Sequence, residues 1–448
     1  MEELTRDQLI EIILELQAQV KMLTERVAAL EKENADLRSR LGGGGDAATP
    51  DWVKPNRKDR REAERGERKK RKQSFTRKRD IPTQVIYHAV DNCPDCGREL
   101  SGGWVHDRRQ VIEIPNTPVE IIEHVLVARR CGVCGKRHIP KLELSGQVLG
   151  KCRFGIRLMS VIASMAIECR MPYRIIKKTL ESLYGLKISF GEIAEILHKV
   201  AERGQRAYDG LLSEVRGSPV VNADETGWRE DGVNGYIWSF STPSVRYFLY
   251  KHSRASAVVK EALGDEFTGA LVSDFYGAYN IYEGVKQRCW VHLLRDIKKL
   301  VEKHPTNKSV VSWADNVKKT YKRAKEVADG DFSQMQRVRA RQIFEKRLLA
   351  FATPYLGVKT APQRVLAKRI DGFLGELFTF VDMDGVPSEN NAAERAVRPA
   401  VIARKVSGGS RSAKGSKTKM ILMSLFGTWS LRQINPINAC VSILTSQN

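Results

Sequence analysis

The 448-residue sequence lacks a long hydrophobic run: no 18 consecutive residues are apolar, and charged residues are spread through the first 20 positions. A helix that crosses a bilayer needs about 20 predominantly apolar residues. A secretory signal peptide needs an uninterrupted apolar core. We therefore expect a cytoplasmic protein without a membrane partner.

Acidic residues are scarce relative to basic ones. The chain has 53 Asp and Glu against 75 Lys and Arg, which gives a formal net charge of +22. A surplus of this size favours a polyanionic partner, and nucleic acid is the first candidate. Charge alone also fits a basic, well-solvated protein such as a ribosome-associated factor.

Residues 1–41 carry an unbroken heptad pattern. Leu occupies the d positions and mostly β-branched residues occupy the a positions; the repeat consists of Leu9, Ile13, Leu16, Val20, Leu23, Val27, Leu30, Asn34, Leu37 and Leu41. This pattern predicts a two-stranded parallel coiled coil and hence a homodimer. A polar Asn at an a position fixes register and dimer state in such coils. An amphipathic helix packed on its own domain is the alternative.

A basic arm follows the coil over residues 42–81, beginning with four glycines that end the helix. Residues 54–79 contain fourteen Lys or Arg and almost no large apolar residue. Such a segment buries too little surface to fold alone. We predict a flexible arm that becomes ordered on phosphates, with a merely solvated linker as the alternative.

Four of the eight cysteines form two CxxC pairs, each followed by Gly, and they are Cys93, Cys96, Cys131 and Cys134. Two such pairs supply four thiolates for one tetrahedral, structural Zn²⁺. The interval between the pairs fits a zinc ribbon with a hairpin near 104–114 and 119–128, in a zinc-binding domain over 82–150. Disulfides are the alternative, which a reducing cytoplasm disfavours.

Residues 151–215 show helical periodicity, with a break at 185–189. Two helices joined by a Gly turn, the second opened by Ser189, form the layout of a helix-turn-helix module. The second helix of such a module enters the major groove of DNA. A helical bundle without DNA contacts produces the same pattern.

Two apolar strand patterns each carry an aspartate at their exit: Asp224 after residues 220–223 and Asp274 after residues 269–273. Two strand-like runs and a helical pattern lie between them. This order is that of an RNase H-like sheet, in which the first and fourth strands are neighbours. We therefore expect both carboxylates side by side in an α/β catalytic domain whose first part spans 216–300.

A third carboxylate comes from the segment 388–399. Asn391, Glu394 and Arg398 are spaced i, i+3 and i+7 and share one helical face. Glu389 is the rival, but it falls at the expected helix start, where an acid also complements the helix dipole. Residues 395–419 contain eight bases and no acid. The basic side chains that we predict to contact the DNA backbone are Arg395, Arg398, Arg404, Lys405 and Arg411.

Phosphoryl transfer by two metal ions needs hard anionic oxygens on rigid supports. We predict that Asp224, Asp274 and Glu394 hold two catalytic Mg²⁺ ions, with Mn²⁺ as a substitute. Residues 301–385 show helical patterns and predict an all-helical insertion. Residues 386–448 then form the second part of the catalytic domain with its basic tail.

Four motifs resemble signatures of the IS66 family of bacterial and archaeal insertion-sequence transposases: DETGW at 224–228, DFYGAY at 274–279, CWVH at 289–292 and NNAAERAVRP at 390–399. The resemblance covers essentially the whole chain and implies that the three acids are a DDE triad. It also implies that His292 approaches the DNA near the scissile phosphate, in a prokaryotic, nucleoid-associated protein. The Gly-, Ser- and Lys-rich stretch at 407–417 is a departure from the family pattern.

The sequence thus predicts a multidomain α+β transposase with a coiled coil, a zinc ribbon, a helix-turn-helix module and an RNase H-like catalytic domain. It would bind double-stranded DNA, both element ends and target, and catalyse strand cleavage and transfer. Accessory proteins of the same element are possible partners. The alternatives are an RNase H-like nuclease or resolvase, which cuts without joining, and a domesticated zinc/helix-turn-helix regulator.

We expect one Zn²⁺ per chain. Cys96→Ser removes one of four ligands, so zinc content should fall well below one equivalent and thermal stability should fall with it, because metal binding contributes to folding. Elemental analysis and thermal denaturation measure both effects. Cys169→Ser, outside both CxxC pairs, should retain the metal. A metal-free wild-type chain with an unchanged melting temperature would contradict the prediction.

Overall fold

The computed structural model describes residues 19, 22–28, 31, 80–114 and 118–446. The chain divides into two compact units, residues 1–113 and 114–448. Most of the predicted coiled coil and nearly all of the basic arm lie outside the described residues. The described residues between 19 and 31 are helical and exposed, so the pairing of two such helices remains a prediction.

Each CxxC pair forms a tight turn of the same kind. Cys93 N–H donates to Arg98 O (2.8 Å) and Gly97 N–H donates to Cys93 O (2.8 Å). Cys131 repeats both contacts with the residues that follow it, and strands β1 (Arg129–Arg130) and β2 (Arg137–His138) flank that turn. Main-chain hydrogen bonds lower the pKa of the Cys93 and Cys131 thiols, which favours the thiolate that a metal binds.

The predicted hairpin between the two cysteine pairs is not formed in the described residues. Residues 104–114 and 118–128 contain no strand and are exposed almost throughout. Without apolar side chains packed on either face, two strands gain too little from pairing to be stable. The first cysteine pair belongs to one unit and the second to the other, so the four-thiolate zinc site remains a prediction.

After β1 and β2, the second unit continues with three helices, α3 (Ile156–Ile167), α4 (Tyr173–Tyr184) and α5 (Phe190–Arg216). α4 ends at Gly185, whose φ of 68° is the left-handed conformation that glycine accepts readily. Ser189 caps α5 in a reciprocal capping box with Glu192. The two expected helices, the Gly turn and the Ser cap are therefore present, whereas a helix-turn-helix module remains a prediction. However, α5 is 27 residues long and buries one face in the core against α3 and α13 (Ala413–Leu431).

The sheet has five strands in the order β5-β4-β3-β6-β7. They are β3 (Val220–Glu230), β4 (Val233–Ser241), β5 (Arg246–Lys251), β6 (Ala270–Ser273) and β7 (Lys286–Arg288), with α6 (Ala257–Leu263) before β6 and a 3₁₀ turn, η1 (Gly277–Ile281), after it. β3, β4 and β5 are antiparallel, whereas β6 and β7 run parallel to β3. The first and fourth strands are neighbours, as predicted.

β3 is longer than the sequence pattern indicates. Asp224 was expected at the strand's exit, but β3 continues to Glu230 because β4 pairs with it from Asn222 to Glu230. β6 pairs with β3 only as far as Asn222. The parallel part of β3 therefore ends near Asp224, while its antiparallel part extends beyond it.

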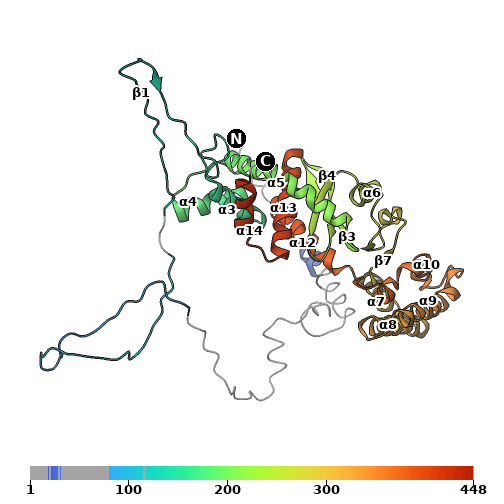
Figure 1. Ribbon diagram of the computed structural model, residues 1–448. Coiled ribbons are helices and arrows are strands. Elements are labelled where there is room, and N and C mark those ends of the chain that lie inside the picture. The colour runs from blue at the N-terminus through green and yellow to red at the C-terminus, as the bar shows by residue number, and fades with distance from the viewer. Residues whose placement is uncertain (1–18, 20–21, 29–30, 32–79, 115–117, 447–448) are drawn as a thin grey trace, which may run out of the picture. The chain divides into compact units, whose positions relative to one another are not determined.

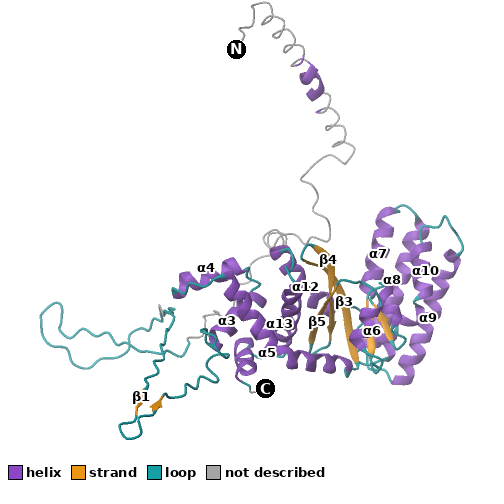
Figure 2. Ribbon diagram, turned by 90° about the horizontal axis from the view of Figure 1, so that it is seen from above, coloured by secondary structure: helices purple, strands orange, loops and turns teal. Residues whose placement is uncertain are grey.

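Alternate residues of β3 and β6 face two different cores. Val221, Ala223 and Leu271 pack with α3, α5, α13 and α14 (Pro436–Thr445), whereas Val220 and Val272 pack with a second helical group. That group comprises α7 (Trp290–Lys303), α8 (Lys308–Asp329), α9 (Gln334–Leu356), α10 (Arg364–Gly372), η2 (Leu374–Glu376) and α11 (Thr379–Asp382). Figures 1 and 2 show the sheet between the two helical groups. The insertion is helical as predicted, and its helices begin already at Trp290.

α12 (Asn391–Ser407) packs its alanines against Trp228, Ile237 and Phe248 of the sheet. The glycine-rich loop after α12 is ordered against the end of β3. Ser410 N–H donates to Arg229 O, and Asp231 N–H donates to Ser410 O, both at 2.8 Å. The loop thus covers part of an exposed strand edge, a feature that proteins commonly protect. Among the described residues, no helix has the length and apolar character needed to cross a membrane.

Gly409 is the position of this loop least tolerant of a side chain. Its φ is +145°, and a Cβ there would lie 2.2 Å from Arg229 O. We expect Gly409→Ala to displace the loop and destabilise the chain by about 2 kcal/mol, measured as a melting temperature lower by several degrees. Gly357→Ala is the control, because its Cβ would enter open space. Equal melting temperatures for the two variants would show that the loop does not stabilise β3.

Candidate active site

Asp224 and Asp274 lie at the same level of neighbouring parallel strands. The register pairs Val220 with Ala270, Val221 with Leu271 and Asn222 with Val272, a constant offset of 50 positions. The two aspartates keep this offset two residues further on, and both are half-buried. The structure therefore brings the two predicted carboxylates together.

Glu394 lies in the first turn of α12, and Asn390 fixes the start of that helix to β3. Asn390 is 1% exposed. Its side-chain amide donates to Ala223 O (2.7 Å), and Asn222 Nδ2 donates to Asn390 Oδ1 (3.0 Å). Its main-chain N–H donates to Cys289 Sγ (3.1 Å). These contacts hold the helix start beside the strand residue that precedes Asp224.

Asn222 and Cys289 also support the site, although no sequence motif predicted that role. Asn222 interrupts an otherwise apolar strand run, which is a signal in retrospect. A buried amide needs hydrogen-bond partners, and its position two residues before Asp224 points to the same face.

His292 lies next to Glu394, in the first turn of α7. Its Nδ1 is 3.8 Å from Glu394 Oε1, and in the described part of the chain both atoms are buried without a hydrogen-bond partner. Trp290 N–H donates to Ser388 O (3.0 Å), so the starts of α7 and α12 are joined. Buried polar atoms without partners are costly, so this corner of the site is suited to a cation or a polar ligand.

The acids are close enough to influence one another's ionisation. Burial raises the pKa of Asp224 to about 7, and the charges of Glu225, Asp274 and Glu394 act in the same direction. The main-chain N–H of Glu225, 2.9 Å from Asp224 Oδ1, offsets part of this effect. Clustered carboxylates of this kind are stabilised by a cation.

The side chains do not converge as a formed metal site. Within the residues that the structure describes, no three His, Cys, Asp or Glu side chains are grouped closely enough to hold an ion. The acids are therefore electrostatic neighbours rather than a preassembled ligand set. Their oxygen donors still suit Mg²⁺ or Mn²⁺, and the buried Glu394 Oε1 without a hydrogen-bond partner has capacity for a cation.

Two nearby glutamates are placed differently from the triad. Glu225 is on the opposite face of β3, where its side chain is 3% exposed and accepts hydrogen bonds from Arg254 and Tyr279. Glu389 precedes the Asn390 cap and is not part of α12. Of the two acids weighed as the third carboxylate, only Glu394 is on the helix.

The predicted DNA-contacting bases fall into two groups. Arg395, Arg398, Lys405 and Arg411 are exposed. Arg404 is half-buried, and its Nη1 donates to Gly227 O at 2.6 Å. Arg404 therefore braces the edge of β3, whereas the other four side chains are available to phosphates.

The helical module presents its bases on α4 rather than on the start of α5. Arg174, Lys177 and Lys178 of α4 are exposed. The first turns of α5 instead carry Glu192 and Glu195. Acids disfavour close approach to DNA, so the major-groove role of α5 has no support from its surface charge.

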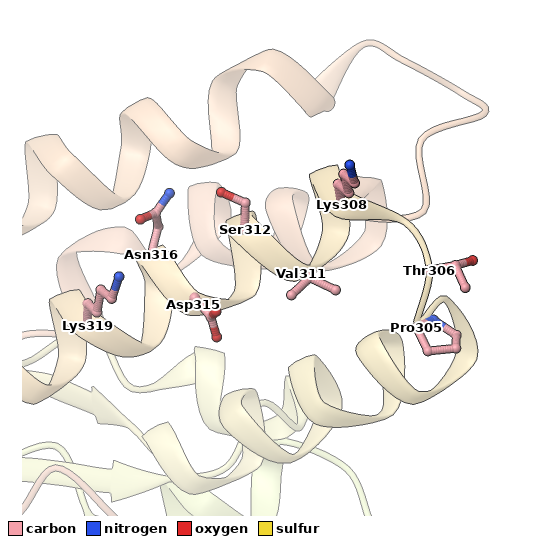
Figure 3. Close-up of a pocket in the computed structure, with 8 residues that line it drawn as sticks. All are labelled: Pro305, Thr306, Lys308, Val311, Ser312, Asp315, Asn316 and Lys319. Carbon is pink, nitrogen blue, oxygen red and sulfur yellow. The ribbon is translucent and has the colours of Figure 1, made fainter.

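A separate hollow of about 410 Å³ lies in the helical insertion, along one side of α8 and the loop before it (Figure 3). Its lining residues are Pro305, Thr306, Lys308, Val311, Ser312, Asp315, Asn316 and Lys319. None of the triad carboxylates contributes to it. The chemistry that the sequence predicts therefore belongs to the sheet and not to this hollow.

A central mixed sheet, surrounding helices and clustered acids in a strongly basic chain are compatible with an α+β transposase. Residues 151–418 match the family model described as Transposase IS66 family. The match covers more than half of the chain, so the chain belongs to the IS66 family of transposases, as the sequence motifs indicated. A search among curated proteins found no match. Membership implies DNA binding, DNA cutting and the use of a divalent metal.

Asn390 offers a direct test of how the site is supported. Asn390→Ala leaves Ala223 O and Asn222 Nδ2 without their buried partner, which should cost about 2–3 kcal/mol of stability. Thermal denaturation measures the loss. Asn391→Ala, one residue further along and only half-buried, is the matched control and should change stability by less than about 1 kcal/mol. Equal effects would show that the Asn390 contacts do not anchor α12.

Proposed function

We propose that the chain cuts DNA at the ends of a mobile element and joins those ends to target DNA. In this proposal Asp224, Asp274 and Glu394 are the catalytic, metal-binding carboxylates. The observation that carries it is that Asp224 in β3 and Asp274 directly after the neighbouring β6 lie at one level, while Asn390 anchors the helix start that carries Glu394 to β3. A chain with a net charge of +22 provides the surroundings that DNA requires.

Each carboxylate has a rigid support, which two-metal chemistry requires. Asp224 is within β3, Asp274 directly follows β6, and Glu394 is held through Asn390. When bound, a pair of Mg²⁺ or Mn²⁺ ions would activate the attacking oxygen and stabilise the leaving oxygen. The carboxylates orient that pair, and the exposed bases Arg395 and Arg398 would neutralise DNA phosphates nearby.

A protein nucleophile is not required by this scheme. Cys289, beside the start of α12, is fully buried, and its sulfur accepts a hydrogen bond from the main-chain N–H of Asn390. Burial raises the pKa of the Cys289 thiol, which keeps it protonated and unreactive. Its role is therefore to support the site, and catalysis rests on positioning and charge neutralisation.

The other parts of the chain would recognise DNA and assemble the complex. We assign DNA contacts to the arm at 42–81, the zinc-binding domain at 82–150 and the helical module at 151–215. One Zn²⁺ would be held by the four CxxC cysteines, and residues 1–41 would form the homodimer. The catalytic domain would span 216–300 and 386–448, interrupted by the insertion at 301–385.

Isosteric variants test the triad. Asp224→Asn, Asp274→Asn and Glu394→Gln should each lower the rate of cleavage of end DNA in Mg²⁺ by at least about 10²–10³-fold, because each removes a negative ligand. DNA affinity, measured separately, should survive. Glu389→Gln is the matched control and should retain activity.

The opposite pattern for the two glutamates, with Glu394→Gln active and Glu389→Gln inactive, would overturn the assignment of the third carboxylate. Supplying precut ends and a target duplex separates a transposase from a nuclease, because only the transposase forms joined product.

A further inference from the structure

A cavity of about 390 Å³ opens beside the edge of β3, beyond Asp224 along the strand. In the described sheet, β6 pairs with β3 only at Val220, Val221 and Asn222. Further along the same edge, the next β-bridge joins Glu230 to Ser410. The edge between these two points is closed by α12 and not by another strand.

α12 follows this edge away from the carboxylates. Glu394 in its first turn interacts with Asp224, whereas Arg404, near its end, donates from Nη1 to Gly227 O (2.6 Å). Gly227 is three residues beyond Asp224, which corresponds to about 10 Å along a strand. A DNA strand at the carboxylates would therefore lie within reach of the cavity.

The lining of the cavity combines small, aromatic and planar polar groups. Gly408 borders open space, and the half-buried Tyr236 supplies aromatic surface, while Trp228, 2% exposed, is part of the buried wall. Trp228 is held in place, because its indole N–H donates to Ser410 Oγ (3.2 Å) and the ammonium of Lys419 lies 5.5 Å from its ring centroid. The guanidinium groups of Arg229 and Arg404 and the side-chain amide of Asn234 complete the lining.

These groups favour a nucleobase over a phosphate. Gly408 ends α12, and a helix C-terminus carries partial negative charge that repels anions. Arg404 is already engaged with a main-chain carbonyl, and Arg229 donates from Nε to Asn234 Oδ1 (3.3 Å). Flat aromatic surface and planar hydrogen-bonding groups are what enzymes use to hold a base outside the duplex.

We propose that this cavity receives a nucleobase extruded from the DNA strand next to the scissile phosphate. The inference rests on the proposed function, because it requires DNA at the carboxylates. A separation of about 10 Å equals about three base steps of 3.4 Å each, so the extruded base comes from the few nucleotides beside the cleavage position. Binding of the extruded base would fix the position of the scissile phosphate relative to Asp224 and Glu394.

The test uses the full-length chain and end DNA with 2-aminopurine placed singly at each nucleotide around the cleavage position. The fluorescence of this base rises when it leaves the stack, and binding without divalent cations gives the signal without cleavage. One position should brighten on binding. Asn234→Trp should abolish the increase, because Asn234 is an exposed residue of the lining and the larger ring fills the cavity.

Val233→Trp is the matched control. Val233 is the exposed neighbour of Asn234 in β4 and does not line the cavity, since successive side chains point to opposite faces. Asn234→Trp should also weaken end binding by about 5- to 100-fold, as expected for one lost base-stacking contact. An abasic nucleotide at the brightening position should remove the difference between the two variants. Tyr236→Leu, which keeps an apolar side chain but removes the aromatic ring, should likewise reduce binding.

The base-binding proposal would be overturned if no position brightened, or if Asn234→Trp and Val233→Trp gave the same fluorescence increase and the same affinity for end DNA. Cleavage in Mg²⁺ would still support the proposed function in that case. Brightening that Asn234→Trp abolishes, in a chain that never cleaves DNA, would support the cavity and overturn the proposed function.

Discussion

The position of the third carboxylate depends on one buried side chain, that of Asn390. Its amide is hydrogen-bonded to Asn222 and Ala223 of β3, and its main-chain N–H meets Cys289 Sγ. These contacts join segments 168, 167 and 101 residues apart in the sequence. These hydrogen bonds join neutral groups. They therefore hold α12 in place without neutralising any of the carboxylates that would bind the metal ions. They keep Glu394 beside the strands although the helical insertion separates the two in the sequence.

The same geometry carries an electrostatic cost. Burial raises the pKa of Asp224 to about 7, and the charges of the neighbouring acids act in the same direction. Glu394 Oε1 and His292 Nδ1 lie buried close by, without hydrogen-bond partners in the described chain. A fold tolerates such an arrangement where function requires it. Divalent cations would relieve the repulsion, and DNA phosphates would complete the coordination. The surrounding bases then favour approach of the phosphates.

The sequence predicted the parts of this account that depend on local pattern. Strand runs ending in Asp224 and Asp274 predicted the strand order, and i, i+3, i+7 spacing placed Glu394 on a helix. It did not predict that β3 continues to Glu230, because that extension depends on pairing with β4 and on cover from Ser410. The two helices and the Gly turn between them were visible in the sequence, whereas the burial of α5 against α13 is a tertiary contact. Arg404 looked like a DNA contact by composition, but its hydrogen bond to Gly227 O is long-range.

The central claim, that metal ions held by the three acids contact the scissile phosphate, is tested most directly by sulfur substitution. One non-bridging oxygen of that phosphate is replaced by sulfur, and cleavage by the full-length chain is compared in Mg²⁺ and Mn²⁺. Mg²⁺ prefers oxygen ligands, whereas Mn²⁺ accepts sulfur more readily. The account predicts strongly impaired cleavage in Mg²⁺ that Mn²⁺ restores for one of the two sulfur stereoisomers. Equal loss of cleavage in both metals, or no loss in either, would contradict it.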